Sequence, residues 1–496
     1  MAATVFTPYS TVESLLGAKP TWIPNALDVL RIQSYVTYEE IYWNVPDVFQ
    51  ITLRGSNELP LYVPSAKTIV DATNRYTAPG FTVSAAGTGA DATVATTQLS
   101  AFLRRERFLS RFSGAKLYGI MRGDWIWHMT ADATKPEGSR ISLTPLDPGM
   151  YFPIPDDDDV DKITGCHLVE LITDSDGSHI RRLTYRKVPQ PGGTVRISVE
   201  DALFETDDWE GPASKPLRIL TPVTMLDPRI SSLPVYHIPN TDFPGDPFGS
   251  SEIRGMERLM AGLAQTLSDE DLALALDGIG VYATDGNQPV DPVTKKPTSW
   301  KLGPGRVVHT DGNFFNRVNG VTDLSENYGA HYDRIWDAIK QASATPDIAI
   351  GAVDVQIASS GVALQLQLGP MLAKAGDKSS IIVDVHNQMF YDWLTMWEPV
   401  YEGNDYEGVT VNCTTGSAVP VDRVQRFAEL NDMLDRGVID TGYYRAECVK
   451  LGYAFPSDIG PKADAEFAER NPSGGVAGAA DPFADRLTQE QGNAQP

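Results

Sequence analysis

Carboxylates are the chemically active side chains that stand out in this sequence. The 496 residues contain 65 Asp and Glu against 41 Lys and Arg. Four aspartates in a row, Asp156 to Asp159, follow Pro155 and offer the oxygen ligands that divalent cations prefer. Paired carboxylates can also serve as the acid and base of glycoside hydrolysis, but no spacing singles out such a pair. We interpret the aspartate run as a solvated loop.

Motifs for nucleotide, metal or nucleophilic chemistry are absent from the sequence. There is no phosphate loop of the form G-x-x-x-x-G-K-[S/T], no G-x-G-x-x-G after a strand, and no H-E-x-x-H or G-x-S-x-G. The 7 histidines are scattered, and the 3 cysteines, Cys166, Cys413 and Cys448, form no C-x-x-C pair. Residues 174–177, Asp-Ser-Asp-Gly, lack the remaining ligands of a calcium loop and predict a hairpin turn. We therefore expect no catalytic residue, no metal site and no cofactor.

The net charge of −24 argues against a protein that wraps nucleic acid, because wrapping needs many Lys and Arg to neutralise phosphates. Two interpretations remain open: a soluble acidic surface, or a path of like charge along which DNA slides without being held. One segment, residues 285–319, is locally basic. Candidates in it for contact with an acidic partner or with DNA are Lys295, Lys296, Lys301 and Arg306.

Neither end of the sequence looks like part of a packed core. Residues 1–24 are expected to form an irregular arm, and their start lacks the basic and apolar regions of a secretory signal. Residues 466–496 are rich in Ala, Gly, Asp, Asn and Gln, which predicts disorder. No run of residues is long and apolar enough for a transmembrane helix, so we expect no membrane partner.

The first half of the chain mixes helical and strand patterns, which predicts an α+β protein. Apolar spacing predicts helices over 25–43, over 65–76 with Ser65 as N-cap, and over 98–121. Residues 85–97, rich in Ala, Gly and Thr, are expected to be an exposed linker.

Charged and aromatic residues give two further expectations in this half. The run Arg104-Arg105-Glu106-Arg107 is expected to be a solvated or interface face. From 124 to 233, period-2 alternation predicts half-buried strands, with Trp125, Trp127 and Met129 on one face of the first.

The second half is predicted to be mainly helical. A helix from about 250 to 278 is expected to kink or restart at Ser268, which has capping-box spacing to Asp271. Ser325 is expected to cap a helix over 325–343 with Trp336 on its apolar face. An acidic loop, 344–358, separates it from a long amphipathic helix over 359–397 with Ser360 as N-cap. Two shorter helices follow, over 422–436 and from a Thr441 cap.

Four passages, in this order, resemble the portal proteins of tailed double-stranded DNA bacteriophages. The first is the helix 65–80, with its Ile-Val-Asp centre, and the second is Pro-Phe-Gly-Ser-Ser-Glu-Ile at 247–253. The third is Ser-Ser-Gly-Val-Ala-Leu at 359–364, close to the start of the family's long helix, and the fourth is Leu-Asp-Arg-Gly-Val-Ile-Asp-Thr at 434–441. Together they cover roughly residues 25–460, and each alone is a weak signal.

The resemblance implies a portal fold with regions named wing, stem, clip and crown. It implies an order of regions along the chain: arm 1–24, wing 25–248, stem helix 249–284, clip 285–320, stem helix 321–343, tunnel loop 344–360, long helix and wing return 361–419, crown 420–465 and tail 466–496. It also implies a ring of about twelve subunits at one vertex of the virion, assembled in the host cytoplasm. The Trp336 face of the second stem helix would pack on a neighbouring subunit.

The same resemblance implies what the ring does and what it contacts. Double-stranded DNA would pass through it during packaging and ejection. The other implied partners are the terminase large subunit, the major capsid and scaffolding proteins and a head-tail adaptor. Asp347 and Asp354 from every subunit would form acidic rings in the bore that repel DNA phosphates. The other loop residues expected to line the bore are Ile348, Ile350, Val353, Val355 and Gln356.

Two other classes of protein stay open. One is an acidic glycoside or ester hydrolase whose β-rich domain spans 124–235. The other is a different structural protein of a virion. The portal interpretation predicts no enzymatic activity, because the sequence has no phosphate loop with which to hydrolyse ATP.

Overall fold

The computed structural model describes most of the chain in two compact units, residues 1–418 and 419–496. The described ranges are 25–53, 60–87, 90–159, 161–174, 177–210, 214–279, 281–284, 287–298, 315–318, 324–351, 361–418 and 423–450. Helices and antiparallel sheets both contribute, so the α+β class is confirmed. The expected arm, the tail and the Ser360 cap lie outside these ranges.

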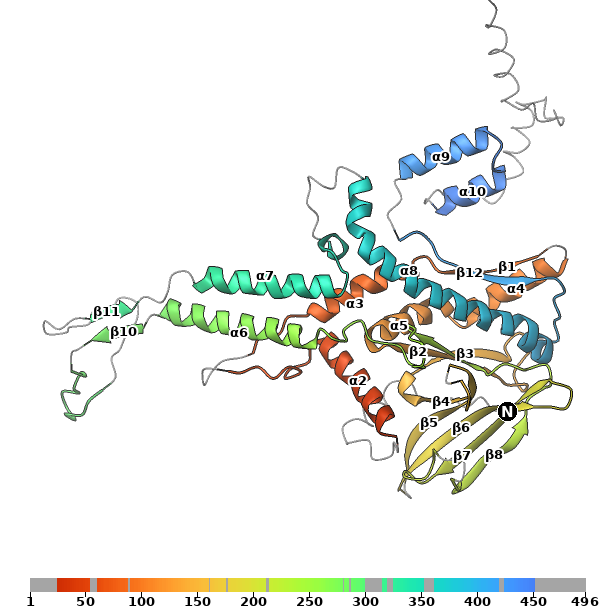
Figure 1. The fold of residues 1–496 in the computed structure, drawn as a ribbon, viewed down its shortest axis with the longest axis horizontal. Coiled ribbons are helices and arrows are strands. Elements are labelled where there is room, and N and C mark those ends of the chain that lie inside the picture. The colour runs from red at the N-terminus through yellow and green to blue at the C-terminus, as the bar shows by residue number, and fades with distance from the viewer. Residues whose placement is uncertain are drawn as a thin grey trace, which may run out of the picture. The chain divides into compact units, whose positions relative to one another are not determined.

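Two antiparallel sheets form the β-rich part of the first unit. The larger has the order β4-β5-β6-β7-β8 and the smaller the order β3-β2-β9 (Figure 1). The predicted hairpin is confirmed, since β5 and β6 pair as far as Asp174 and Gly177. The strands, with the one-turn helix η1 (Pro148–Met150), are β2 (Asp124–Ala131), β3 (Ile141–Leu146), β4 (Tyr151–Pro155), β5 (Ile163–Asp174), β6 (Gly177–Pro189), β7 (Val195–Phe204), β8 (Arg218–Met225) and β9 (Val235–Pro239).

The main core lies around β2, which is buried on both faces rather than on one. Trp125 and Trp127 pack against the ring of His386, which comes from the long helix α8 (Gly361–Asp392). On the other side His128 bonds the Tyr185 hydroxyl of β6 at 3.0 Å. The sequence pattern identified the strand but not its second neighbour, because a buried histidine looks polar in an alternating pattern.

The segment expected to be a linker is a strand and a helix instead. β1 (Thr82–Ala86) pairs with β12 (Thr410–Thr414), and α4 (Ala90–Arg105) follows. Ala92 and Ala95 are buried in α4 because their small side chains allow close packing. Alanine is also the strongest helix former. The composition that suggested a flexible linker therefore suits a closely packed helix.

The single helix expected over 98–121 is two helices. α4 ends at Arg105, and α5 (Phe108–Arg122) begins after Arg107, whose φ of 50° is left-handed and breaks the helix. Glu106 at this break is buried and accepts hydrogen bonds from Arg111 at 3.1 Å and from the Leu143 backbone at 3.2 Å. Arg104, Arg105 and Arg107 are exposed, as expected of a solvated face, whereas Glu106 is buried in an ion cluster.

Two further helices pack beside α5. α2 (Ala26–Trp43) is confirmed, and the Asn25 side chain caps it by accepting from Leu27 N at 2.9 Å. α3 (Ser65–Tyr76) is confirmed in extent, but Pro64 occupies its N-cap position and Ser65 is its first residue. Ser65 is buried, and proline before the first turn needs no N–H there.

Two long helices lie side by side, α6 (Glu257–Ile279) and α7 (Leu324–Ala342), and Figure 1 shows the short β10–β11 pair at their far ends. β10 (Val281–Thr284) pairs with β11 (Phe315–Val318). α6 runs through Ser268 without a break. The Ser268 hydroxyl bonds Ala264 O at 2.8 Å and accepts from Leu61 N at 2.9 Å, so it does not cap a new helix. α7 begins one residue before Ser325, which therefore does not cap it.

Trp336 is part of its own subunit's packing. With Tyr332 and Ile335 it packs on a cluster that contains Met260 and Ile339. Part of the Trp336 face is therefore covered by α6 of the same subunit, and packing of its remaining surface on a neighbouring subunit stays a prediction.

The long helix α8 begins at Gly361, directly after Ser360. It is bent in Figure 1, and Pro370 inside it removes a backbone donor and crowds the preceding turn. It continues as a π-helical segment, η3 (Trp393–Glu402), five residues beyond the predicted end at Trp397.

The second unit contains α9 (Arg423–Asp435) and α10 (Thr441–Lys450), as the sequence predicted. The cap of α10 is Asp440 rather than Thr441, since the Asp440 carboxylate accepts from Tyr443 N at 2.6 Å. Tyr444 of α10 donates to the Asn431 side chain of α9 at 2.7 Å.

Candidate functional site

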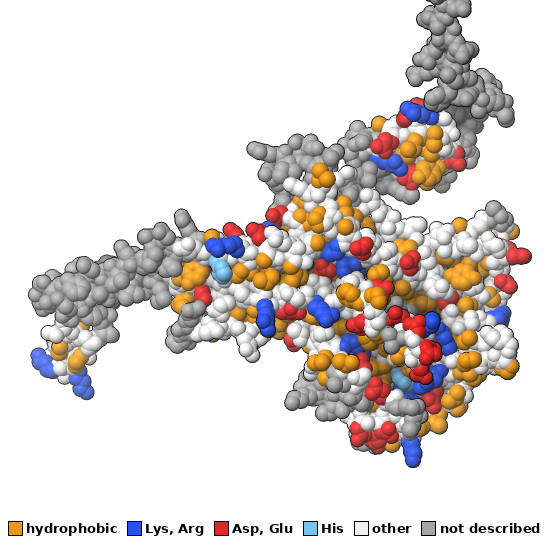
Figure 2. All heavy atoms as spheres, viewed as in Figure 1, with side chains coloured by type: hydrophobic (Ala, Val, Ile, Leu, Met, Phe, Trp, Pro, Cys, Tyr) orange, Lys and Arg blue, Asp and Glu red, His pale blue; other side chains and the backbone are white. Residues whose placement is uncertain are grey.

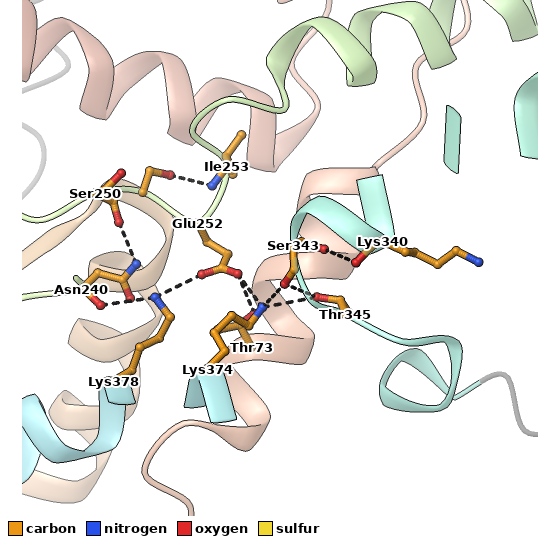
Figure 3. A network of polar contacts seen from close by, with 11 residues as sticks. Thr73, Asn240, Ser250, Glu252, Ile253, Lys340, Ser343, Thr345, Lys374 and Lys378 are labelled. Carbon is orange, nitrogen blue, oxygen red and sulfur yellow. Dashed lines mark hydrogen bonds and ion pairs between the residues drawn. The ribbon is translucent and has the colours of Figure 1, made fainter. Parts of the chain in front are cut away.

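The candidate site lies where the chain leaves α7 and turns toward α8. Figure 3 shows Glu252 at its centre, between side chains from α3, from the end of α7 and from α8. Glu252 follows the Pro-Phe-Gly-Ser-Ser sequence at 247–251 and precedes α6. The site therefore joins segments that are far apart in the chain, since Glu252 is 179 positions from Thr73 and 122 positions from Lys374.

The carboxylate of Glu252 serves one buried lysine, Lys378, and one partly buried lysine, Lys374. Glu252 Oε1 lies 2.5 Å from Lys374 Nζ, and Glu252 Oε2 lies 3.2 Å from Lys378 Nζ. The exposed fractions of the three side chains are 6%, 17% and 8%. Burial lowers the pKa of Lys374, an effect that Glu252 opposes and Lys378 reinforces. Without Glu252, both ammonium groups would be buried with no counter-charge.

Neutral oxygens complete the coordination of the two ammonium groups. Lys374 Nζ also donates to Ser343 O at 2.5 Å and to Thr73 Oγ1 at 3.0 Å, while Lys378 Nζ donates to Asn240 O at 3.2 Å. The Thr345 hydroxyl, 3.4 Å from Lys374 Nζ, donates to Ser343 O. This network fixes the start of the 344–351 segment against α3 and α8.

The turn that presents Glu252 depends on a close backbone approach. Gly249 N donates to the buried Asp124 carboxylate at 2.7 Å. The Ser251 hydroxyl donates to Met121 O at 2.5 Å and accepts from Ile253 N at 3.0 Å. A Cβ on Gly249 would collide with Gly123 O and would lie 2.6 Å from Asn240 N. Only glycine fits at this position without moving two strand ends.

Replacing Gly249 with alanine is expected to lower the free energy of unfolding by about 1–3 kcal/mol, because two backbone segments must move apart. Urea denaturation measures the change. Gly114→Ala in α5 is the matched control: a Cβ at that position would have no neighbour within 4 Å, and helix propensity predicts a gain of up to about 1 kcal/mol. Equal effects of the two substitutions would contradict this account of the turn.

The described half of the expected tunnel loop is a 3-10 turn, η2 (Asp347–Ile350), anchored on its own chain. Ala349 is 1% exposed and packs in a cluster with Ala72, Leu368 and Met371. Ile348 and Ile350 are half-buried against the same cluster. Much of their apolar surface is therefore used within the subunit. Val353, Asp354, Val355 and Gln356 lie outside the described residues.

Asp347 is the exposed residue of this turn. Its side chain is 58% exposed, and its Oδ1 lies 2.6 Å from Lys340 Nζ of α7. Lys340 also pairs with Asp337 at 2.8 Å. Asp347 is thus not an isolated negative charge, as the sequence alone suggested, because α7 places a lysine beside it.

The basic segment is described only in part. Lys295 and Lys296 are exposed in a turn within residues 287–298, and Figure 2 shows basic side chains at the end of this segment. Neither lysine has an ion-pair partner within the described residues. Lys301 and Arg306 fall outside them, so the four cations are not brought together by the described part of the structure.

The three ionic residues of the site were not predicted from the sequence. A signal was present: Lys374 and Lys378 are spaced i, i+4 on α8, on the side that also carries Met371, Ala375 and Ile382. Two lysines on the buried face of an amphipathic helix require an acidic partner. The sequence could not show which of 65 carboxylates supplies it.

The acidic residues that first suggested metal or acid–base chemistry have local roles. Asp156 Oδ1 accepts from Asp158 N at 3.0 Å, and Asp159 pairs with Lys162 at 2.9 Å. Across the described residues, no group of three or more His, Cys, Asp or Glu side chains is arranged to hold a metal ion. None of the described helices combines the length and apolar character needed to cross a bilayer.

Comparisons with known proteins give structural likenesses only. No family model and no curated protein matches the chain. Chains from three solved assemblies are similar in structure. One comes from the "virion of native gene transfer agent (GTA) particle", with a TM-score of 0.40 and 12% identity over 85% of this chain and 94% of that one.

The other two come from neck assemblies. In the "neck of native GTA particle computed with C12 symmetry" the TM-score is 0.39 and the identity 14%, over 79% of this chain and 91% of that one. In the "neck of empty GTA particle computed with C6 symmetry" the values are 0.42 and 14%, over 86% and 94%. Likenesses this weak assign no function to the chain.

Proposed function

We propose that this chain is the subunit of a portal ring, through which double-stranded DNA enters and leaves a phage-like particle. The four sequence passages motivate the proposal, and the order of elements supports it. α6 leads out to β10, β11 and α7 lead back, and η2 and α8 follow. That order corresponds to stem, clip, stem, tunnel loop and long helix. In this proposal the wing is 25–248 and the crown 420–465.

The observation that carries the proposal is the joint between the second stem helix and the body. The Glu252 network ties Ser343 and Thr345 to α8 and α3. A subunit that lines a DNA channel must hold its inner helices against the sliding polymer. A buried ionic joint provides such rigidity at the base of the pair α6 and α7.

A closed ring requires two different complementary faces on each subunit. Large apolar side chains are exposed on the elements proposed to meet: Leu274 of α6 is 52% exposed and Leu366 of α8 is 76% exposed. In a ring, neighbouring subunits would cover these surfaces, and the burial of apolar area would stabilise the assembly.

In this ring Asp347 faces the bore next to its partner Lys340. Because Lys340 is shared by Asp337 and Asp347, each cluster keeps one net negative charge and repels DNA phosphates less than the two carboxylates would without the lysine. DNA would then meet little electrostatic resistance in either direction. Ile348 and Ile350 pack within the subunit and would hold the turn in place. Asp354 is proposed as a second acidic residue facing the bore.

The exposed Lys295 and Lys296, with Lys301 and Arg306, are proposed to contact the packaging terminase and later the head-tail adaptor. Capsid and scaffolding proteins would surround the wing. Charge reversal at Lys295, Lys296 and Lys301 should weaken terminase binding in a pull-down from purified components. Unchanged binding would remove these residues from the interface.

Native mass spectrometry and electron microscopy test the proposed function together. We expect a mass near twelve times the subunit mass of 54.1 kDa and a ring with a central hole. A map of the ring should place Asp347 at the hole. A monomer that turns over a sugar or ester substrate would contradict the proposal and favour the hydrolase alternative.

A further inference from the structure

A cavity of about 430 Å³ lies between the two sheets of the first unit. Its walls come from β2 of the smaller sheet, from β6, β7 and β8 of the larger sheet, and from the π-helical segment η3. Small-molecule sites in proteins have volumes of roughly 300–1,000 Å³, so this cavity can hold a ligand of one or two rings. None of the residues of the Glu252 network lines it.

Three aromatic side chains dominate the wall of this cavity. Trp397 and Tyr401, four positions apart in η3, stack with their ring centroids 5.5 Å apart and their planes inclined by 22°. Tyr185 of β6 adds a third ring, and its hydroxyl is bonded to His128 Nε2 of β2 at 3.0 Å. Aromatic rings attract another ring by offset stacking or by edge-to-face contact. The wall therefore favours a planar aromatic ligand.

The part of the wall that η3 forms has an unusual backbone conformation. π-Helical turns are rare and often occur at functional sites, and η3 keeps this conformation over 10 residues. Two arginines hold its last turn. Arg140 Nη1 donates to Tyr401 O at 2.7 Å, and Arg229 Nη1 donates to Pro399 O at 3.1 Å. The wall is thus formed before a ligand binds, which lowers the entropy lost on binding.

The charged groups that line the cavity are already paired or neutral. Arg181 donates to both carboxylate oxygens of Asp201, at 3.1 and 2.7 Å. Asp227 pairs with Arg229 at 3.1 Å. His128 is neutral, because burial lowers its pKa to about 3. A charged ligand would lose its hydration here without gaining a counter-charge, whereas an uncharged ligand would not.

We propose that this cavity binds an uncharged aromatic small molecule of one ring or two fused rings. The three aromatic side chains contact the ring of the ligand, and Leu183 and Val199 add apolar contacts. Thr221, half-buried on β8, supplies a hydroxyl group for a polar edge of the ligand. This inference does not depend on the proposed ring.

Isothermal titration calorimetry of the full-length protein with indole and two of its derivatives tests the inference. Indole is an uncharged molecule of two fused rings, and we expect it to bind with a dissociation constant below about 1 mM. Indole-3-acetamide and indole-3-acetate have nearly the same shape and differ in charge. The acetate should bind at least about tenfold more weakly than the acetamide, because the cavity offers it no unpaired cation.

Two substitutions in the cavity wall, with one control, locate the binding site. Thr221→Trp should weaken indole binding at least about tenfold, because the new side chain fills the cavity. Thr224→Trp is the matched control, since it makes the same change at an exposed position of the same strand outside the cavity wall, and it should leave binding unchanged. Tyr401→Ala removes one ring without filling the cavity and should weaken binding about tenfold. Circular dichroism checks that each variant is folded.

Three outcomes would overturn the inference. The first is that indole does not bind to the unaltered protein. The second is equal affinity for indole-3-acetamide and indole-3-acetate, which would contradict the selection for uncharged ligands. The third is unchanged indole binding in whichever of the folded variants Thr221→Trp and Tyr401→Ala is measured, which would place the bound molecule elsewhere.

Discussion

Glu252→Gln is expected to lower the free energy of unfolding by about 3–5 kcal/mol, the usual effect of removing one partner from a buried ion pair. The amide has nearly the shape of the carboxylate, so packing is conserved and the lost charge is isolated. Lys374 and Lys378 would then be buried without a counter-charge, held only by neutral oxygens of Ser343, Thr73 and Asn240. Urea denaturation followed by circular dichroism measures the change.

A matched acidic residue and a double variant make this prediction specific. Asp159→Asn removes the carboxylate of an exposed pair with Lys162, and we expect its effect on the free energy of unfolding to be small beside that of Glu252→Gln, because water screens the pair. On a Lys374→Met background, Glu252→Gln should lower the free energy of unfolding clearly less than it does alone. The reason is that only one ammonium group, that of Lys378, then loses its counter-charge. Additive effects of the two substitutions would show that Glu252 and Lys374 are not coupled as their 2.5 Å contact indicates.

Lowering the pH from about 6.5 to about 4 is expected to destabilise the protein steeply, because three histidines are buried in their neutral form. Burial lowers the pKa of His386 to about 4, and the pKa values of His128 and His167 to about 3. Nearby Arg182 and Arg186 lower the pKa of His167 further. In this pH window the unfolded chain binds protons that the folded chain excludes, so stability falls as the pH falls.

His386 is neutral for a clear structural reason. Trp127 Nε1–H donates to His386 Nε2 at 3.1 Å, so that nitrogen carries no proton. The proton sits on Nδ1, which donates to Ile382 O at 2.7 Å. The rings of Phe81 and Phe112 also contact the imidazole and offer no counter-charge. Protonating Nε2 would place its N–H group opposite the N–H group of Trp127, so that two donors would face each other inside an aromatic cluster.

The size of the expected loss in stability follows from the difference between the pKa of His386 in the unfolded chain and in the folded chain. A shift from 6.5 to about 4 corresponds to up to about 3 kcal/mol lost at pH 4 for His386 alone. His386→Gln keeps a donor and an acceptor but cannot titrate, so it should reduce the slope of stability against pH by up to about 1.4 kcal/mol per pH unit. Urea unfolding at a series of pH values measures the slope. His331→Gln, at an exposed position of α7, is the control and should leave it unchanged.

Most elements of the fold were predictable, because they are specified by local patterns. The helices α2 and α3, the β5–β6 hairpin and α7 followed by α8 all have apolar spacing or turn residues that act over a few positions. Errors occurred where tertiary contacts outweighed the local pattern. Arg107 breaks the helix because the neighbouring Glu106 is held by Arg111 and the Leu143 backbone, and the alanines of α4, whose composition suggested a linker, are small enough to pack closely.

The candidate site was only partly predictable from the sequence. The order of helix, acidic turn and long helix located its segments, whereas the role of Asp347 in a bore stays a prediction. Lys340, the ion-pair partner of Asp347, lies seven positions before it in the chain, and the two meet only because α7 ends in a tight turn.

The class of elements, their order and the acidic character of this protein all follow from its amino-acid sequence. Only the folded chain shows that Glu252 meets Lys374 and Lys378, and that η2 packs on α3 and α8. The physical reason is the distance along the chain over which each kind of interaction acts. Helix periodicity, caps and turns depend on neighbours a few residues apart, whereas a buried charge is stable only beside a counter-charge, and the fold brings Lys374 to Glu252 across 122 positions of the chain.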